Sequence, residues 1–79
     1  MNIKEERKRL GLKQYQMARV VGLATENYNK YENGKAPLSE WRYNLACQFF
    51  KDYEKISEEK ENLIKYYEQK SIDIKKKQI

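Results

Sequence analysis

The stretch Gly22–Lys35, GLATENYNKYENGK, holds the side chains of this sequence that are best suited to hydrogen-bond a large polar partner. Tyr28 and Tyr31 lie three residues apart, so in a helix they share one face and can pack inward. The side chains left on the outer face are short or charged: Thr25, Glu26, Asn27 and Lys30. Such a face is either simply solvated or made to be pressed against a partner rich in donors and acceptors.

The residue types needed for catalysis are largely missing. The sequence has no histidine, which removes the commonest general base and the commonest neutral metal ligand. Its single cysteine, Cys47, can form neither an internal disulfide nor a cysteine-rich zinc site, and its apolar neighbours favour a buried hydrophobic role. No glycine loop for phosphates is present. We therefore expect a protein that is not an enzyme and that needs no metal and no cofactor.

The size and the charge of the chain further limit the class of protein that this sequence can be. The 79 residues fit one small domain, with 39% apolar and 37% charged residues and a net charge of +5. Residues 1–50 carry nine Lys and Arg against five Glu, whereas residues 51–79 carry eight Lys against seven acidic residues. The basic excess therefore lies with the polar stretch and favours a polyanionic partner. No apolar run is long enough for a signal peptide or a membrane span, so we expect a cytoplasmic protein.

Apolar periodicity and helix-end signals predict an all-α fold of five helices. Asn2 is placed to cap the first helix, and Gly11, Gly22 and Gly34 are placed to end the first three. The predicted helices run over about 3–10, 13–21, 25–33, 39–50 and 52–69. A frayed basic tail is expected after the last helix.

The second and third predicted helices are joined by about three residues around Gly22, which is the spacing of a helix-turn-helix. The segment from Arg7 to Lys35 resembles the phage-repressor and Cro-type helix-turn-helix proteins, the XRE family, and the resemblance runs from about Ile3 to Ile56. The features that carry it are Arg7, Gly11-Leu12, Gln14, Ala18, Gly22, Tyr28, Tyr31, Glu32-Asn33-Gly34-Lys35 and Leu45-Ala46. It implies a lambda-repressor-like DNA-binding domain whose third helix enters the major groove.

The resemblance also implies site residues. Thr25, Glu26 and Lys30 match its main base-reading positions, and Asn27 stands beside them. Lysine can donate to guanine, asparagine can pair with adenine, and glutamate can accept from cytosine. The expected phosphate contacts, which give affinity without reading sequence, are Lys13, Gln14, Tyr15, Asn33, Lys35 and Arg42. Arg7 and Glu32 match a family ion pair that joins the first helix to the end of the third.

The C-terminal part of the chain is expected to mediate dimerisation or the binding of a protein partner. We divide the chain into a helix-turn-helix domain, 1–56, and a helical extension with a basic tail, 57–79. The second half carries more apolar residues than one helix of a small core needs, which predicts a dimer or partner surface. Its residues are Phe50, Tyr53, Ile56, Leu63 and Tyr67.

Two functions follow from these expectations. The first is a sequence-specific regulator of double-stranded DNA, a repressor of phage, mobile-element or antitoxin type that binds a palindromic operator as a homodimer. The alternative is a protein-interaction module that keeps the helix-turn-helix scaffold and binds a protein partner through its C-terminal helix.

Overall fold

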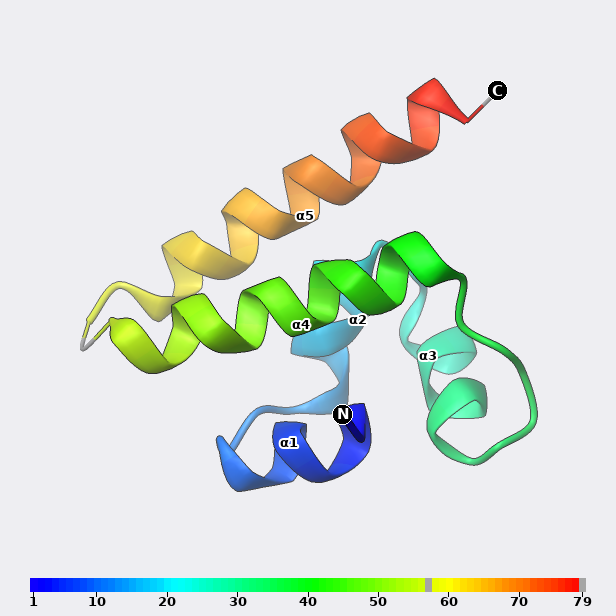
Figure 1. Cartoon of the computed structure of the whole chain (residues 1–79), viewed down its shortest axis with the longest axis horizontal. Coiled ribbons are helices and arrows are strands. Elements are labelled where there is room, and N and C mark those ends of the chain that lie inside the picture. Colours follow the sequence, from blue (N-terminus) through cyan, green and yellow to red (C-terminus); the bar gives the residue numbers. More distant parts are fainter. Residues whose placement is uncertain (57, 79) are drawn as a thin grey trace.

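The computed structural model describes residues 1–56 and 58–78, and within these ranges the backbone forms five helices and no strand. They are α1 (Ile3–Arg9), α2 (Gln14–Val21), α3 (Thr25–Glu32), α4 (Glu40–Lys55) and α5 (Lys60–Lys77). The two long helices, α4 and α5, pack against each other and run in opposite directions (Figure 1). The predicted all-α, five-helix fold is thus confirmed.

Helix α2 is the centre of the core, because it packs against α3, α4 and α5. Its residues Met17, Val20 and Val21 have no exposed surface. Burial of apolar side chains is the main driving force for folding, at about 25 cal/mol per Å² removed from water. Ala18 of α2 is also buried, and the remaining buried apolar residues come from every other helix and from the loop before α2: Ile3, Leu12, Tyr28, Leu45, Ala46, Phe49, Phe50, Tyr53, Ile64 and Tyr67.

The turn between α2 and α3 depends on Gly22. Its φ is +76°, in the left-handed region that side chains disfavour, and the backbone N–H of Leu23 donates to the carbonyl of Ala18 at 2.9 Å to close the helix end. A Cβ at this position would lie 2.8 Å from Ser71 Oγ and 3.1 Å from Arg42 Nη1. Glycine is therefore needed both for the backbone conformation and for the close approach of α5.

Helix α4 is longer than the sequence predicted. An end near Phe50 was expected, but the helix continues to Lys55. Phe50 and Tyr53 are both buried, so the apolar stripe of α4 carries on for another turn and keeps the helix in contact with the core. The helix ends where Ile56 adopts extended backbone, and α5 begins directly after Glu59, whose φ is +60°.

The predicted end of α5 near Gln69 and the frayed basic tail are also wrong. The helix continues to Lys77. Ser71 is buried and Ile74 packs against the core, so two further contacts hold the helix beyond Gln69. The lysines at 75–77 therefore form the last turn of a docked helix.

Polar contacts also hold α5 in place. Arg19 of α2 forms ion pairs with Glu61, at 3.0 Å between Nη2 and Oε2, and with Glu68, at 3.2 Å between Nε and Oε2. The hydroxyl of Tyr67 donates to the carboxylate of Asp52 on α4. Helix α5 is thus fixed to both of the helices that it covers.

This packing corrects the predicted dimer or partner surface. Phe50 and Tyr67 are each 2% exposed and Tyr53 is 9% exposed, while Ile56 and Leu63 are half-buried. The reason is that α5 folds back along α4, so that Phe50, Tyr53 and Tyr67 lie in the core of the same chain and Leu63 packs against it. The apolar residues that looked surplus in the sequence are needed to attach α5.

The predicted division at residue 56 lies at the end of α4, but it does not separate two cores. Ile64 and Tyr67 of α5 belong to the same buried cluster as the residues of α2. Residues 57 and 79, the two ends of the predicted extension, lie outside the described residues.

Candidate nucleic-acid interface

Helix α3 has the two faces that its sequence predicts. Tyr28 is fully buried and Tyr31 is half-buried, with their ring centres 6.0 Å apart. The polar residues of the other face are all exposed: Thr25, Glu26, Asn27 and Lys30. Ala24 occupies the N-cap without a side-chain hydrogen bond, so the Thr25 hydroxyl stays available at the first position of the helix.

A shallow hollow of about 500 Å³ lies across the start of α2 and the outer face of α3. Its lining residues are Gln14, Thr25, Glu26, Asn29, Lys30 and Lys35. The structure thereby brings together three candidate base contacts and two candidate phosphate contacts. Lys13 and Tyr15, which flank Gln14 in the sequence, and Asn33 after α3 are also exposed.

A chain of hydrogen bonds holds this hollow to the rest of the molecule. Arg7 donates to both carboxylate oxygens of Glu32, from Nε at 2.7 Å and from Nη2 at 2.9 Å. Gln14 Nε2 donates to Glu32 Oε1 at 3.0 Å, and Gln14 Oε1 accepts from Asn29 Nδ2 at 3.0 Å. Asn33 Nδ2 donates to Asn29 Oδ1 at 3.1 Å. The chain fixes the positions of α1, α2 and α3 relative to one another.

Sequence reasoning named the pair of Arg7 and Glu32 and the importance of Gln14, but it did not foresee that Asn29 links them to the outer face. Asparagine three residues before the end of a short helix carries no distinctive signal. Only the spatial arrangement shows that both ends of the Gln14 amide are used, one by Glu32 and one by Asn29.

The environment of Glu32 shifts its ionisation. Its side chain has no exposed surface, and burial alone would raise the pKa of the carboxyl. Hydrogen bonds from Arg7 and Gln14 and the positive charge of Arg7 outweigh burial, so the pKa of Glu32 lies below its ordinary value of 4.5. The buried Tyr28 hydroxyl lies in the same region, and burial raises the pKa of that tyrosine.

The lowered pKa of Glu32 predicts a pH-dependent stability. Because the folded state holds the carboxylate charged, this contribution is fully present above about pH 4.5 and is lost as the pH falls through the lower pKa of the folded protein. Urea unfolding at a series of acidic pH values measures it. Glu32→Gln should flatten the acid limb of the stability curve, and Glu26→Gln, on the exposed face, should not. An equally steep acid limb in Glu32→Gln would contradict the assignment.

Arg42 lies apart from the hollow. Its Nη1 donates to the carbonyl oxygens of Val21 and Gly22, at 2.6 Å and 2.9 Å, and its guanidinium stacks 4.3 Å from the centre of the Trp41 ring. These contacts satisfy carbonyl groups at the end of α2. The guanidinium of Arg42 thus caps the carboxyl end of α2, whereas the sequence predicted a phosphate contact for this residue.

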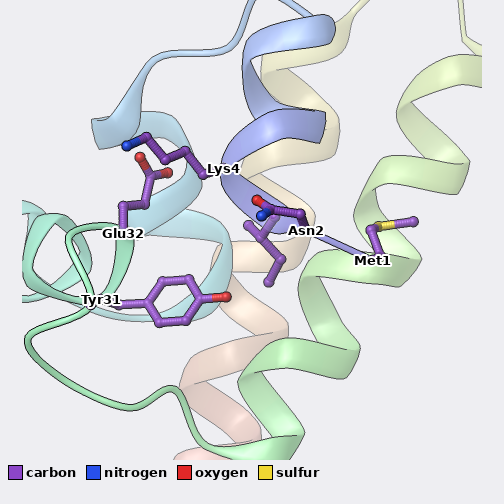
Figure 2. A pocket seen from close by; sticks show the side chains of 7 residues that line it. Met1, Asn2, Lys4, Tyr31 and Glu32 are labelled. Atoms are coloured by element: carbon purple, nitrogen blue, oxygen red, sulfur yellow. The ribbon is translucent and has the colours of Figure 1, made fainter.

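A second hollow, of about 290 Å³, lies where the start of the chain meets the end of α3 (Figure 2). Tyr31, Glu32 and Lys4 face it, together with Met1 and Asn2. The carboxylate of Glu32 is already paired with Arg7, and the carbonyl of Met1 accepts from the Tyr43 hydroxyl at 2.9 Å. This hollow lies between the first residues of the chain and the end of α3, and it contains none of the exposed residues of the outer face of α3.

Comparison with known proteins agrees with this geometry. Residues 3–40 match the family described as helix-turn-helix. Over 49 residues the chain is 39% identical to antitoxin PezA of Streptococcus pneumoniae serotype 4, a match that covers 62% of this chain and 31% of that antitoxin. The chain therefore spans about a third of the length of this relative. No solved structure matches the chain.

Two further observations concern membrane spans and metal sites. Over residues 1–56 and 58–78, no helix combines the length and the apolar character that a membrane crossing requires. In the same part of the chain, no group of three or more acidic or cysteine side chains is arranged to hold a metal ion.

Proposed function

From the XRE-type helix-turn-helix DNA-binding domain that residues 3–40 form, we propose that this chain is a sequence-specific regulator of transcription. It binds double-stranded DNA, acts in the cytoplasm as a homodimer on a palindromic operator, and represses by occupying a promoter. Its mechanism is binding and exclusion, without catalysis. The similarity to antitoxin PezA supports a regulator of the antitoxin type.

The observation that carries the proposal is the hollow that joins Gln14 to the outer face of α3. A helix that reads bases must be held rigidly by groups that do not themselves face the DNA. Here the buried pair of Arg7 and Glu32 supplies that support, and it reaches the outer face through Gln14 and Asn29. A merely solvated helix face has no need of such bracing.

In this arrangement Thr25, Glu26, Asn27 and Lys30 contact base edges in the major groove. The residues proposed to hold phosphates surround them: Lys13, Gln14, Tyr15, Asn33 and Lys35. Gln14 sits at the first position of α2, where the helix dipole adds a favourable field for an anion. Such contacts fix the orientation of the domain, and the α3 side chains then read sequence.

The experiment that tests the proposal is selection of bound duplexes from a random pool at physiological salt. The expected result is an enriched inverted repeat whose half-sites lie about 34 Å, one DNA turn, apart. The spacing would then give the geometry of the dimer. A folded protein that enriches no sequence would contradict the proposal.

Lys30→Ala is expected to weaken binding to the selected operator by about 1–3 kcal/mol and to relax the preference at one base pair per half-site. The reason is that Lys30 is exposed in the hollow, one turn after Glu26, where it can reach a guanine edge. Binding titrations on the operator and on single-base variants measure the effect.

The matched control is Lys65→Ala, which removes one exposed lysine from α5. It should leave the base preference unchanged. If Lys30→Ala weakens every duplex equally, Lys30 contacts a phosphate and does not read a base.

A second candidate function rests on a groove of about 290 Å³ between α4 and α5. Its lining residues are Gln48, Lys51, Asp52, Lys55, Tyr66, Tyr67 and Lys70. Tyr66 is 59% exposed, and Lys70 Nζ lies 6.0 Å from the centre of its ring. Three lysines beside an exposed aromatic ring suit an acidic segment of a protein partner. A binding affinity for random duplex that does not change with salt would favour this function, because a phosphate binder must release counterions.

A further inference from the structure

We propose that Asn29 is a positioning residue for DNA binding, which holds Gln14 and Asn33 so that one amide N–H of each is left to donate to a backbone phosphate. This inference rests on the proposed function and deepens it, because it assigns the phosphate contacts of these two residues to particular atoms. It also gives a role in binding to Asn29, a residue that carries no distinctive signal in the sequence.

The orientation of the amide chain is determined at its buried end by Glu32. This carboxylate is paired with Arg7 and can only accept hydrogen bonds. Its Oε1 accepts from the Gln14 amide at 3.0 Å, so the Gln14 atom at this position must be the nitrogen, Nε2. The oxygen of the same amide is therefore the atom that contacts Asn29.

The same direction continues through the next two amides. Because Gln14 Oε1 can only accept, the donor at 3.0 Å must be Asn29 Nδ2. Asn29 Oδ1 then accepts from Asn33 Nδ2 at 3.1 Å. Reversing any one of the three amides would place two oxygens or two nitrogens against each other. The charge of Glu32 thus sets the orientation of the whole chain.

This orientation leaves donors unused. Each amide nitrogen carries two N–H groups. Within residues 1–56 and 58–78, the nitrogens of Gln14, Asn29 and Asn33 each donate one hydrogen bond, so one N–H of each remains. The oxygens of Gln14 and Asn29, in contrast, both accept already. Gln14 and Asn29 line the hollow and Asn33 is exposed. The amide chain therefore offers a surplus of donors to a partner.

A surplus of donors suits a phosphate better than a base edge. Phosphate oxygens only accept, whereas the edges of base pairs present both donors and acceptors. The charge in the hollow favours the same partner, because Lys30 and Lys35 line it with only one acidic residue, Glu26. The free amide N–H groups and the two ammonium groups together make this part of the hollow suitable for the DNA backbone.

Asn29 links two candidate phosphate contacts that come from different helices. Gln14 is the first residue of α2, and Asn33 is the C-cap of α3. Both are bonded to the one amide of Asn29. Side chains that are already held in place lose less conformational freedom when they bind a partner. Removing the Asn29 amide should therefore weaken both contacts.

The first test is a double-mutant cycle with Asn29→Ala, Gln14→Ala and the double variant. Asn29→Ala is expected to lower affinity about 3- to 10-fold, equally on the selected operator and on random duplex, because it disturbs phosphate contacts. The loss in the double variant is expected to be at least about threefold smaller than the product of the two single losses, since Asn29 acts through Gln14. A general weakening of α3 would instead give losses that multiply, and that result would overturn the role of Asn29.

The second test uses the free protein and does not depend on DNA. NMR relaxation of the side-chain amides of Gln14 and Asn33 is expected to show greater mobility in Asn29→Ala than in the wild type. Asn44→Ala, which removes an exposed asparagine from α4, is the matched control and should change neither these amides nor the affinity. Unchanged mobility in Asn29→Ala would overturn the positioning role.

The two tests separate this inference from the proposed function. If the wild-type protein binds no duplex, the proposed function fails and the phosphate contacts fail with it. If the wild-type protein binds its operator but the losses of Asn29→Ala and Gln14→Ala multiply, only the positioning role of Asn29 is overturned.

Discussion

Replacing Arg7 with methionine is expected to destabilise the folded chain by about 3–5 kcal/mol, because it leaves the buried carboxylate of Glu32 without its ion-pair partner. The side chains of Arg7 and Glu32 are 10% and 0% exposed. Arg7 also donates to the carbonyl of Leu12 at 2.9 Å, and that acceptor would lose its partner too. Urea unfolding followed by circular dichroism measures the loss.

The magnitude is large for a chain of this size, since folded proteins are stable by only about 0.05–0.15 kcal/mol per residue. The double variant Arg7→Met, Glu32→Met provides the control. It removes both charges and keeps an apolar filling, so it is expected to be more stable than Arg7→Met alone. A loss below about 1 kcal/mol in Arg7→Met would mean that the pair behaves like an exposed ion pair.

Gly22→Ala is expected to lower the stability by about 2–5 kcal/mol. About 1–2 kcal/mol comes from holding a residue with a Cβ in the left-handed region, and about 1–3 kcal/mol comes from crowding in a packed site. The new Cβ would lie 3.0 Å from Ser71 Cβ and 3.1 Å from Arg42 Nη1. Thermal and urea unfolding measure the change.

Gly34→Ala is the matched control, because Gly34 has a φ of +73° but nothing within 4 Å of the position of a Cβ. This variant should show only the backbone contribution, about 1–2 kcal/mol. The difference between the two variants then isolates the crowding between the turn and α5. Equal losses would contradict the close packing of Ser71 on Gly22.

The first half of the fold could be predicted from the sequence because its signals are local. Asn2 caps α1 by accepting from the backbone N–H of Glu5 at 3.0 Å, and Gly22 ends α2 in the left-handed conformation. The two tyrosines of α3 turn inward at the spacing of a helix. Each of these features is determined by residues within about one helical turn, so the sequence alone is sufficient.

The second half of the fold could not be predicted as well, because the ends of α4 and α5 depend on how these two helices pack against each other and against the core. The residues near Phe50 and Tyr53 in the sequence do not indicate that α5 folds back to cover them. The same apolar stripe therefore predicts either a core or a dimer surface. The role of Arg42 was missed for the same reason. An arginine near the predicted phosphate contacts in sequence can still lie at the carbonyl end of α2 in space.

The candidate site follows the same division. The outer face of α3 was read correctly from the positions of its polar residues, and the structure shows them exposed. The bracing by Asn29 depends on a contact with Gln14, 15 residues earlier in the chain. Asparagine amides are common on helix surfaces, and only the fold selects this one.

The docking of α5 on α2 also sets an order of events during synthesis. Arg19 pairs with Glu68, 49 residues further along the chain, and the contact between Gly22 and Ser71 forms only after α5 has been synthesised. Ribosomes add about 5–20 residues per second, so the helix-turn-helix segment waits on the order of several seconds for the helix that completes its core. During that interval the nascent chain exposes the apolar side of α2 to chaperones and proteases. The final packing of the helix-turn-helix would therefore form late and abruptly, once the last turns of α5 have left the exit tunnel.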